Sequence, residues 1–132
     1  MSIYSLTLTA PPNDSDEKEI EVQGHYITYV SLRFPPGPMG LLKVGIFYGI
    51  KKIFPSDEEQ WFQGDDEAIE WTEWYELPES PCKLRIVAIN DDDTYEHSVL
   101  VRIATIERKA DLAKRVADAL ISIFRRFLGV IE

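Results

Sequence analysis

The sequence predicts a mainly β protein: an antiparallel β-sandwich or jelly-roll-like domain followed by one C-terminal amphipathic α-helix. Two observations lead to this fold class. Short runs with apolar residues at every second position recur between residues 3 and 106, separated by proline, glycine, asparagine or aspartate. From residue 107 the apolar spacing changes to three and four, which is typical of a helix. We therefore expect a sandwich domain over residues 1–106 and a helix over residues 107–132.

Eight runs carry the β pattern and contain many β-branched and aromatic residues. They cover residues 3–9, 20–22, 25–34, 42–48, 50–54, 68–75, 84–88 and 95–106. In the third run, Tyr26, Val30, Leu32 and Phe34 are expected to share the inward face. The alternation predicts a core that includes Leu6, Leu8, Val30, Leu32, Val44, Ile46, Leu84, Ile86, Val99, Val101 and Ile103.

The size and composition of the chain suit one folded domain. Its 132 residues are 45% hydrophobic and 28% charged, and a chain of this length buries about two thirds of its unfolded surface. The single cysteine, Cys82, has no partner for an internal disulfide, so packing must supply the stability. The sequence shows neither a basic-then-apolar N-terminal signal nor a run of 18 apolar residues. We expect no signal peptide and no membrane span.

The charge is divided unevenly along the chain. Residues 1–106 hold 8 Lys and Arg against 19 Asp and Glu, whereas residues 107–132 hold 6 against 4. An acidic body repels phosphate backbones, so nucleic acid is not an expected partner. The same charge opposes the approach of the weakly basic helix to anionic lipid, which argues against a membrane partner.

The segment from Pro35 to Gly40 cannot continue a central strand. Its three prolines remove backbone donors, and its two glycines relax the chain. We expect an ordered loop at one end of the sandwich, with Phe34 and Met39 as anchors. Pro36, Pro38 and Met39 are candidate binding residues, because such loops commonly carry binding. A rigid crossover between the sheets is the alternative.

Residues 57–79 form the most acidic segment, with ten Asp and Glu and no Lys or Arg. Such carboxylates can ligate Ca²⁺ or act as a pair in glycoside hydrolysis, but they also form ordinary solvated rims. The aromatic residues of the segment, above all Trp61 and Phe62, are candidates for sugar stacking or for packing. Residues 90–93 suit a turn and lack the glycine and distant glutamate of an EF-hand.

The sequence contains no pattern that predicts catalysis. Its two histidines, His25 and His97, belong to no spaced metal motif, and no nucleophile elbow of the G-x-S-x-G kind occurs. We expect no catalytic residue, no cofactor and no metal required for folding, with Ca²⁺ in the acidic loops as the exception to check. The protein is not expected to be an enzyme.

The C-terminal segment has an apolar seam with coiled-coil-like spacing. Ala113, Val116, Leu120, Ile123, Phe127 and Val130 follow one another at intervals of three and four residues. The residues predicted to mediate self-association are Val116, Leu120, Ile123, Phe124, Phe127 and Leu128. Three surfaces that would bury these apolar residues remain open: the sandwich of the same chain, a membrane surface, or the helices of neighbouring copies.

Several short motifs in the body resemble those of small β-sandwich accessory proteins of tailed phages and archaeal viruses. The motifs are Phe34-Pro35-Pro36-Gly37-Pro38, Gly40-Leu41-Leu42, Phe54-Pro55, Gly64, Trp74-Tyr75, and Asn90 with Asp92, Tyr95 and His97. The resemblance covers about residues 4–106 and implies a non-catalytic virion component located in the virion, such as a capsid decoration or a head or tail accessory protein.

Two classes of function are therefore expected. The first is a virion structural protein that forms homo-oligomers and binds a viral shell or tail protein. The alternative is a carbohydrate-binding or adhesion module that uses exposed aromatic residues and acidic loops.

Overall fold

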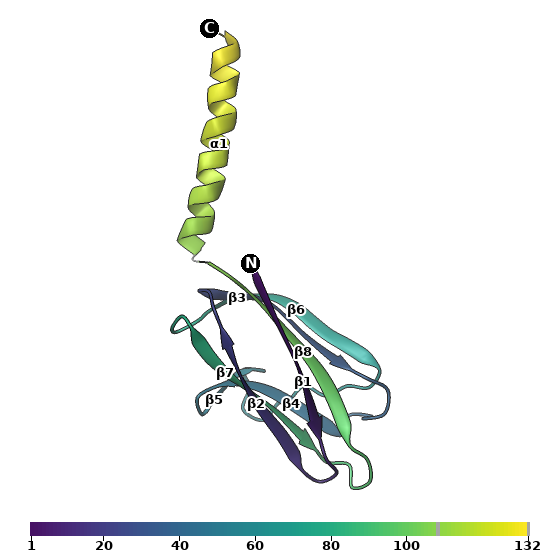
Figure 1. Cartoon of the computed structure of the whole chain (residues 1–132). Coiled ribbons are helices and arrows are strands. Elements are labelled where there is room, and N and C mark those ends of the chain that lie inside the picture. The colour runs from purple at the N-terminus through teal and green to yellow at the C-terminus, as the bar shows by residue number, and fades with distance from the viewer. Residues whose placement is uncertain (108, 132) are drawn as a thin grey trace.

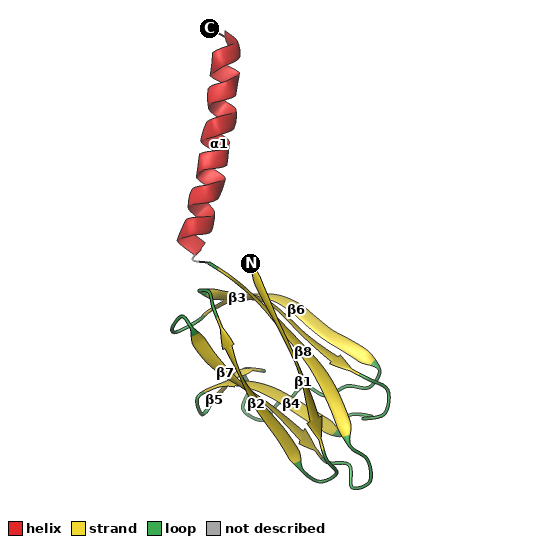
Figure 2. Cartoon of the chain, in the orientation of Figure 1, coloured by secondary structure: helices red, strands yellow, loops and turns green. Residues whose placement is uncertain are grey.

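The computed structural model describes the backbone of residues 1–107 and 109–131, and the side chains of residues 1–107 and 116–127. It confirms the predicted fold class, with strands that form two packed antiparallel sheets and one C-terminal helix (Figure 2). The elements are β1 (Ser2–Ala10), β2 (Ser15–Val22), β3 (Tyr26–Phe34), β4 (Leu42–Tyr48), β5 (Lys51–Phe54), β6 (Glu67–Glu76), β7 (Cys82–Asn90), β8 (His97–Ile106) and α1 (Lys109–Ile131).

The two sheets have the strand orders β1-β8-β3-β6 and β2-β7-β4-β5. The antiparallel pairs β1 with β8, β2 with β7, β3 with β6, and β4 with β5 are nested in the sequence. Apart from β4 and β5, each strand lies in the opposite sheet from the strand that follows it. Nested pairing across two four-stranded sheets is the arrangement of an eight-stranded jelly roll.

The hydrophobic core lies between the two sheets. Ten of the eleven predicted core residues are buried, including Leu32, Ile46 and Ile86 with no exposed surface. Leu6 is only partly buried, so its assignment to the fully buried core was wrong. Leu8 and Ala10 on the same strand are fully buried, so the inward face of β1 is covered only toward the end of the strand.

A β-bulge in β3 changes which residues face the core. The register with β6 and β8 shifts between Ile27 and Tyr29. Ile27 is fully buried, whereas Tyr26 packs edge-on against the half-exposed ring of Trp74, with the ring centroids 5.6 Å apart. The predicted inward position of Tyr26 is therefore wrong, because the extra residue of the bulge inverts the alternation.

β2 begins earlier than its apolar pattern indicates. Its charged first half pairs with β7 from Ser15 onward. Asp16 accepts a hydrogen bond from Thr9 N (3.0 Å), and Lys18 Nζ donates to Thr7 O (2.6 Å). These charged side chains link β2 to β1 where the edges of the two sheets meet, so the strand needs few apolar residues.

The sandwich has two distinct ends (Figure 1). β8 starts at one end with His97 and finishes at the other with Ile106, and α1 follows after a two-residue gap. The connections at the end opposite α1 contain residues 11–14, 35–41, 62–66 and 91–96. We call the surface that these four segments form the loop end. The helix projects away from the sandwich beyond the end of β8 (Figure 1).

Candidate functional site

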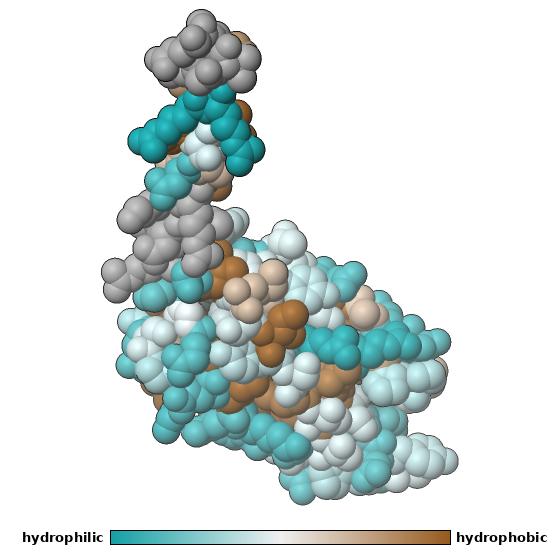
Figure 3. All heavy atoms as spheres, turned by 45° about the horizontal axis from the view of Figure 1, so that its top comes forward, coloured by the Kyte–Doolittle hydropathy of each residue, from teal (hydrophilic) through white to brown (hydrophobic). Residues whose placement is uncertain are grey.

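The helix α1 exposes a continuous apolar face. Val116, Leu120, Ile123, Phe124 and Phe127 have exposed fractions between 55% and 66%, and each was predicted to mediate self-association. The sixth predicted residue, Leu128, has a side chain outside the described residues. Figure 3 shows apolar brown atoms beside hydrophilic teal atoms on the part of the helix that is not grey. Exposed apolar faces of this size are typical of interaction surfaces.

The proline-rich loop lies at the loop end, as predicted. Phe34 is fully buried and anchors it, and Pro38 is also buried. Met39 is not an anchor, because 78% of its side chain is exposed. Pro36 is exposed as well, so the loop presents Pro36 and Met39 outward.

Asp65 holds this loop in place by accepting two backbone hydrogen bonds. Met39 N donates to its Oδ1 at 3.0 Å, and Gly37 N donates to the same oxygen at 2.8 Å. These bonds hold the pKa of the Asp65 carboxyl below its usual value. Met39 has a φ of 48°, a left-handed conformation that is rare for a residue with a side chain. The loop end is therefore fixed by a carboxylate that the sequence pattern did not single out.

A second network fixes the turn between β7 and β8. Asn90 is 1% exposed, and its amide Nδ2 donates to the carbonyl oxygens of Ala10, Pro11 and Tyr95 at 2.8–3.2 Å. Nε2 of His97 lies 2.7 Å from Oδ2 of Asp92. This contact, followed by a backbone bond from Thr94, lowers the pKa of the Asp92 carboxyl.

The two networks bring together motifs that are distant in the sequence. A Cβ atom built on Gly37 would lie 3.7 Å from the His97 ring, so the 35–41 and 91–96 loops lie side by side. Asp91 N donates to Leu41 O (2.9 Å), and Asn13 N donates to Asp92 O (2.9 Å). Most of the short motifs that the sequence analysis singled out therefore meet at the loop end.

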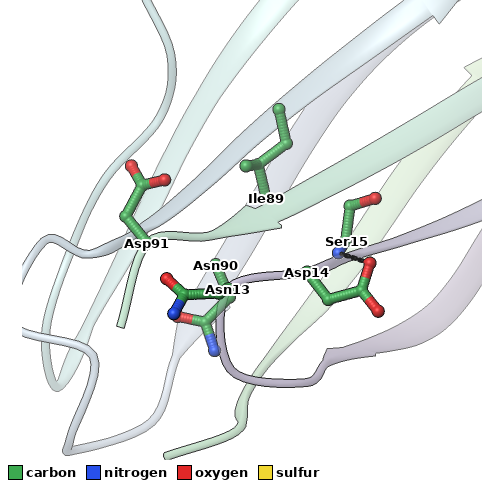
Figure 4. Close-up of a pocket in the computed structure, with 6 residues that line it drawn as sticks. All are labelled: Asn13, Asp14, Ser15, Ile89, Asn90 and Asp91. Atoms are coloured by element: carbon green, nitrogen blue, oxygen red, sulfur yellow. Dashed lines mark hydrogen bonds between the residues drawn. The ribbon is translucent and has the colours of Figure 1, made fainter. Parts of the chain in front are cut away.

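A hollow of about 330 Å³ opens at the loop end beside the start of β2 and the end of β7 (Figure 4). It is lined by Asn13, Asp14, Ser15, Ile89, Asn90 and Asp91. Ser15 N donates to Asp14 Oδ1 (2.8 Å), and Asp91 pairs with Lys43 at 2.9 Å. The hollow is therefore lined mainly by polar groups, and of its two carboxylates Asp91 is paired with Lys43.

Trp61 and Phe62, the candidate aromatic residues of the acidic segment, are engaged in packing. Trp61 lies over Gly45, where a Cβ would come within 2.9 Å of the indole ring, and Lys52 Nζ lies 4.5 Å from the ring centroid. The Phe62 and Trp71 rings are 5.1 Å apart. Trp61 and Phe62 are half-buried, so they do not form the exposed sugar platform that the sequence left open.

The described residues contain no group of three or more His, Cys, Asp or Glu side chains arranged to hold a metal ion. Cys82 is fully buried, and burial raises the pKa of its thiol. Across the same part of the chain, no helix combines the length and the apolar content needed to cross a membrane.

Comparison with known proteins identifies no family. No family model matches the chain, and no curated protein sequence matches it. Solved structures with a similar body include PirA (16% identity, TM-score 0.44, covering 76% of this chain and 94% of that one). The Yersinia pseudotuberculosis-derived mitogen is 9% identical (TM-score 0.46, covering 82% and 89%). Aeromonas hydrophila PliG, a periplasmic inhibitor of g-type lysozyme, is 8% identical (TM-score 0.45, covering 77% and 84%). These are small β-rich proteins, and the likeness does not extend to function.

Two exposed apolar residues of the loop end were not predicted from the sequence. Tyr95 and Leu41 are 68% and 41% exposed there, and neither was a candidate binding residue. The predicted last strand began at residue 95, whereas β8 begins at His97, so Tyr95 was assigned to a strand and not to the exposed loop.

Proposed function

We propose that this protein is a non-catalytic assembly module that associates with itself through α1 and presents its β-sandwich to a larger structure. The observation that carries the proposal is the exposed apolar face of α1, formed by large side chains that recur every three or four residues. Its exposure in the isolated chain favours a role in association.

The setting that we propose is a virion, with the protein acting as a capsid decoration or as a head or tail accessory. The motif resemblance supports this setting, as does the jelly-roll strand order, which is common in viral capsid domains. The fold-level support is an analogy, since one fold hosts many functions. The carbohydrate-binding alternative has less support, because Trp61 and Phe62 are engaged in packing.

A double substitution on the helix tests the proposal. Leu120→Glu with Phe124→Glu places two charges on the apolar face at positions that are exposed in the isolated chain, so the sandwich should remain folded. Light scattering should show an oligomer for the natural chain and a monomer for the variant. The matched control is Ser122→Glu, on an exposed polar position of α1, which should keep the natural mass. Equal masses for all three proteins would contradict the proposal.

A further inference from the structure

The loop end has apolar side chains that are exposed to solvent. Met39 and Tyr95 are 78% and 68% exposed, and Leu41 is 41% exposed. They belong to the 35–41 and 91–96 loops, which lie side by side where Gly37 approaches the ring of His97. The hydrogen bonds to Asp65 and from Asn90 fix the backbone of both loops, so little order needs to be gained on binding.

The charge of the loop end is opposite to that of α1. Its four segments, residues 11–14, 35–41, 62–66 and 91–96, contain seven Asp and Glu and no Lys or Arg. The helix sequence from 112 to 127 contains four Lys and Arg against the single acid Asp118. Among these, Arg126 is exposed about one helical turn from Ile123, so it borders the apolar face, whereas Arg125 is exposed on the opposite side of the helix. Each surface thus combines exposed apolar residues with a net charge that the other surface complements.

The hollow is positioned to receive part of that charge. Asp14 and Asp91 line it (Figure 4), and Asp91 N donates to the carbonyl of Leu41, one of the exposed apolar residues. Because Asp91 is paired with Lys43, the carboxylate that an arginine from a docked helix would meet in the hollow is that of Asp14, while the apolar neighbours of the arginine contact the loops.

The helix is poorly placed to reach the loop end of its own sandwich. α1 begins where β8 finishes, and β8 starts at the loop end. Ten residues of β8 span about 33 Å and 23 residues of α1 span about 35 Å, so a helix folded back along its own sheet would reach the loop end only with its tip. A helix from another copy has no such restriction and can lay its middle turns across these loops.

From these observations we infer that the apolar face of α1, with Arg126 at its edge, docks on the loop end of the sandwich of a second copy. The inference rests on the proposed function, because it names the surface that covers the association helix. Since helix and loop end are different surfaces, the contact is head-to-tail, and repeated copies form either a ring or a filament. An assembly through helix-to-helix contacts would instead leave the loop end uncovered.

Complementation between two full-length variants tests the inference. The helix variant is Leu120→Glu with Phe124→Glu, and the loop variant is Met39→Lys with Tyr95→Lys, which replaces exposed apolar side chains by charges that repel α1. The matched control is Ile3→Lys with Ile50→Lys, which makes the same charge change at 67% and 99% exposed positions away from the loop end.

Sedimentation velocity should show that each of the two variants alone is monomeric and that the control assembles like the natural chain. An equimolar mixture of the helix and loop variants should form a one-to-one complex, because each supplies the surface that the other lacks. Raising the salt from about 50 mM to about 500 mM should weaken the association about tenfold, since screening reduces attraction between opposite charges.

The experiment distinguishes a failure of this inference from a failure of the proposed function. A loop variant that assembles like the natural chain would overturn the head-to-tail contact and leave association through α1 in place. A natural chain that is monomeric would overturn both proposals. A mixture that fails to associate, although circular dichroism shows both variants folded, would also overturn the inference. If the loop variant is misfolded, the single Tyr95→Lys variant takes its place, and it should weaken assembly about tenfold.

Discussion

Nε2 of His97 lies 2.7 Å from Oδ2 of Asp92, and this contact ties the start of β8 to the turn that precedes it. The hydrogen bond from His97 lowers the pKa of the Asp92 carboxyl in the folded protein. A lowered carboxyl pKa contributes stability above the unfolded value of 3.8, and this contribution is lost as the pH falls through the folded value.

We therefore predict that the natural chain loses stability in acid partly through Asp92. Asp92→Asn should lower the melting temperature at about pH 7 and should flatten its decline between about pH 5 and pH 2. Thermal unfolding followed by circular dichroism measures both effects. Glu21→Gln, on an exposed position of β2, is the control and should follow the natural curve. A parallel decline for Asp92→Asn and the natural chain would contradict the assignment.

Asn90 is predicted to be the most sensitive polar residue of the loop end. Asn90→Ala removes the donor to the carbonyls of Ala10, Pro11 and Tyr95 in a buried position, which should cost about 1–3 kcal/mol of unfolding free energy. Denaturant titration gives the value. Gln63→Ala removes an exposed amide that donates to Gly40 O, and should change stability by less than about 0.5 kcal/mol.

We predict that Trp61 packs in its observed position only when residue 45 has no side chain. Gly45→Ala places a methyl group within 2.9 Å of the indole ring and 3.1 Å of Lys52 Cδ. The added bulk should cost about 1–3 kcal/mol and shift the tryptophan fluorescence. Adding Trp61→Ala to Gly45→Ala removes the clash, so the two substitutions together should cost less than the sum of their separate costs. Additive costs would show that Trp61 does not pack on Gly45.

We predict that truncating a core side chain costs less unfolding free energy at the edge of the sandwich than at its centre. Leu32→Ala removes a fully buried side chain and should cost about 2–5 kcal/mol. Leu6→Ala, on the edge strand β1, should cost less because that side chain is only partly buried. Equal costs in denaturant titrations would contradict the graded core.

The strand pattern was predictable where one face of a strand is buried. Val99, Val101 and Ile103 alternate without interruption, and all three are buried in β8. The inversion at Tyr26 and Ile27 was not predictable, because a bulge inserts one residue without changing the local composition. The first half of β2 was missed for a different reason, since Asp16 and Lys18 form hydrogen bonds to β1 in place of apolar contacts.

The candidate site was predictable only in part. Spacing alone identified the apolar residues of α1, because a helix face repeats every three or four positions. The bonds from Gly37 and Met39 to Asp65 join residues 26–28 positions apart, and no local pattern encodes a contact of that range. The same applies to Trp61, a loop residue whose surroundings come from Gly45 on β4 and Lys52 on β5.

The concentration dependence of the mass of the intact natural chain tests association through α1 most directly. Sedimentation velocity from about 1 µM to about 200 µM should show a species heavier than the 15.2 kDa chain that grows with concentration and is absent for Leu120→Glu with Phe124→Glu. A natural chain that stays at 15.2 kDa over the whole range would contradict the assignment of α1 as an association helix.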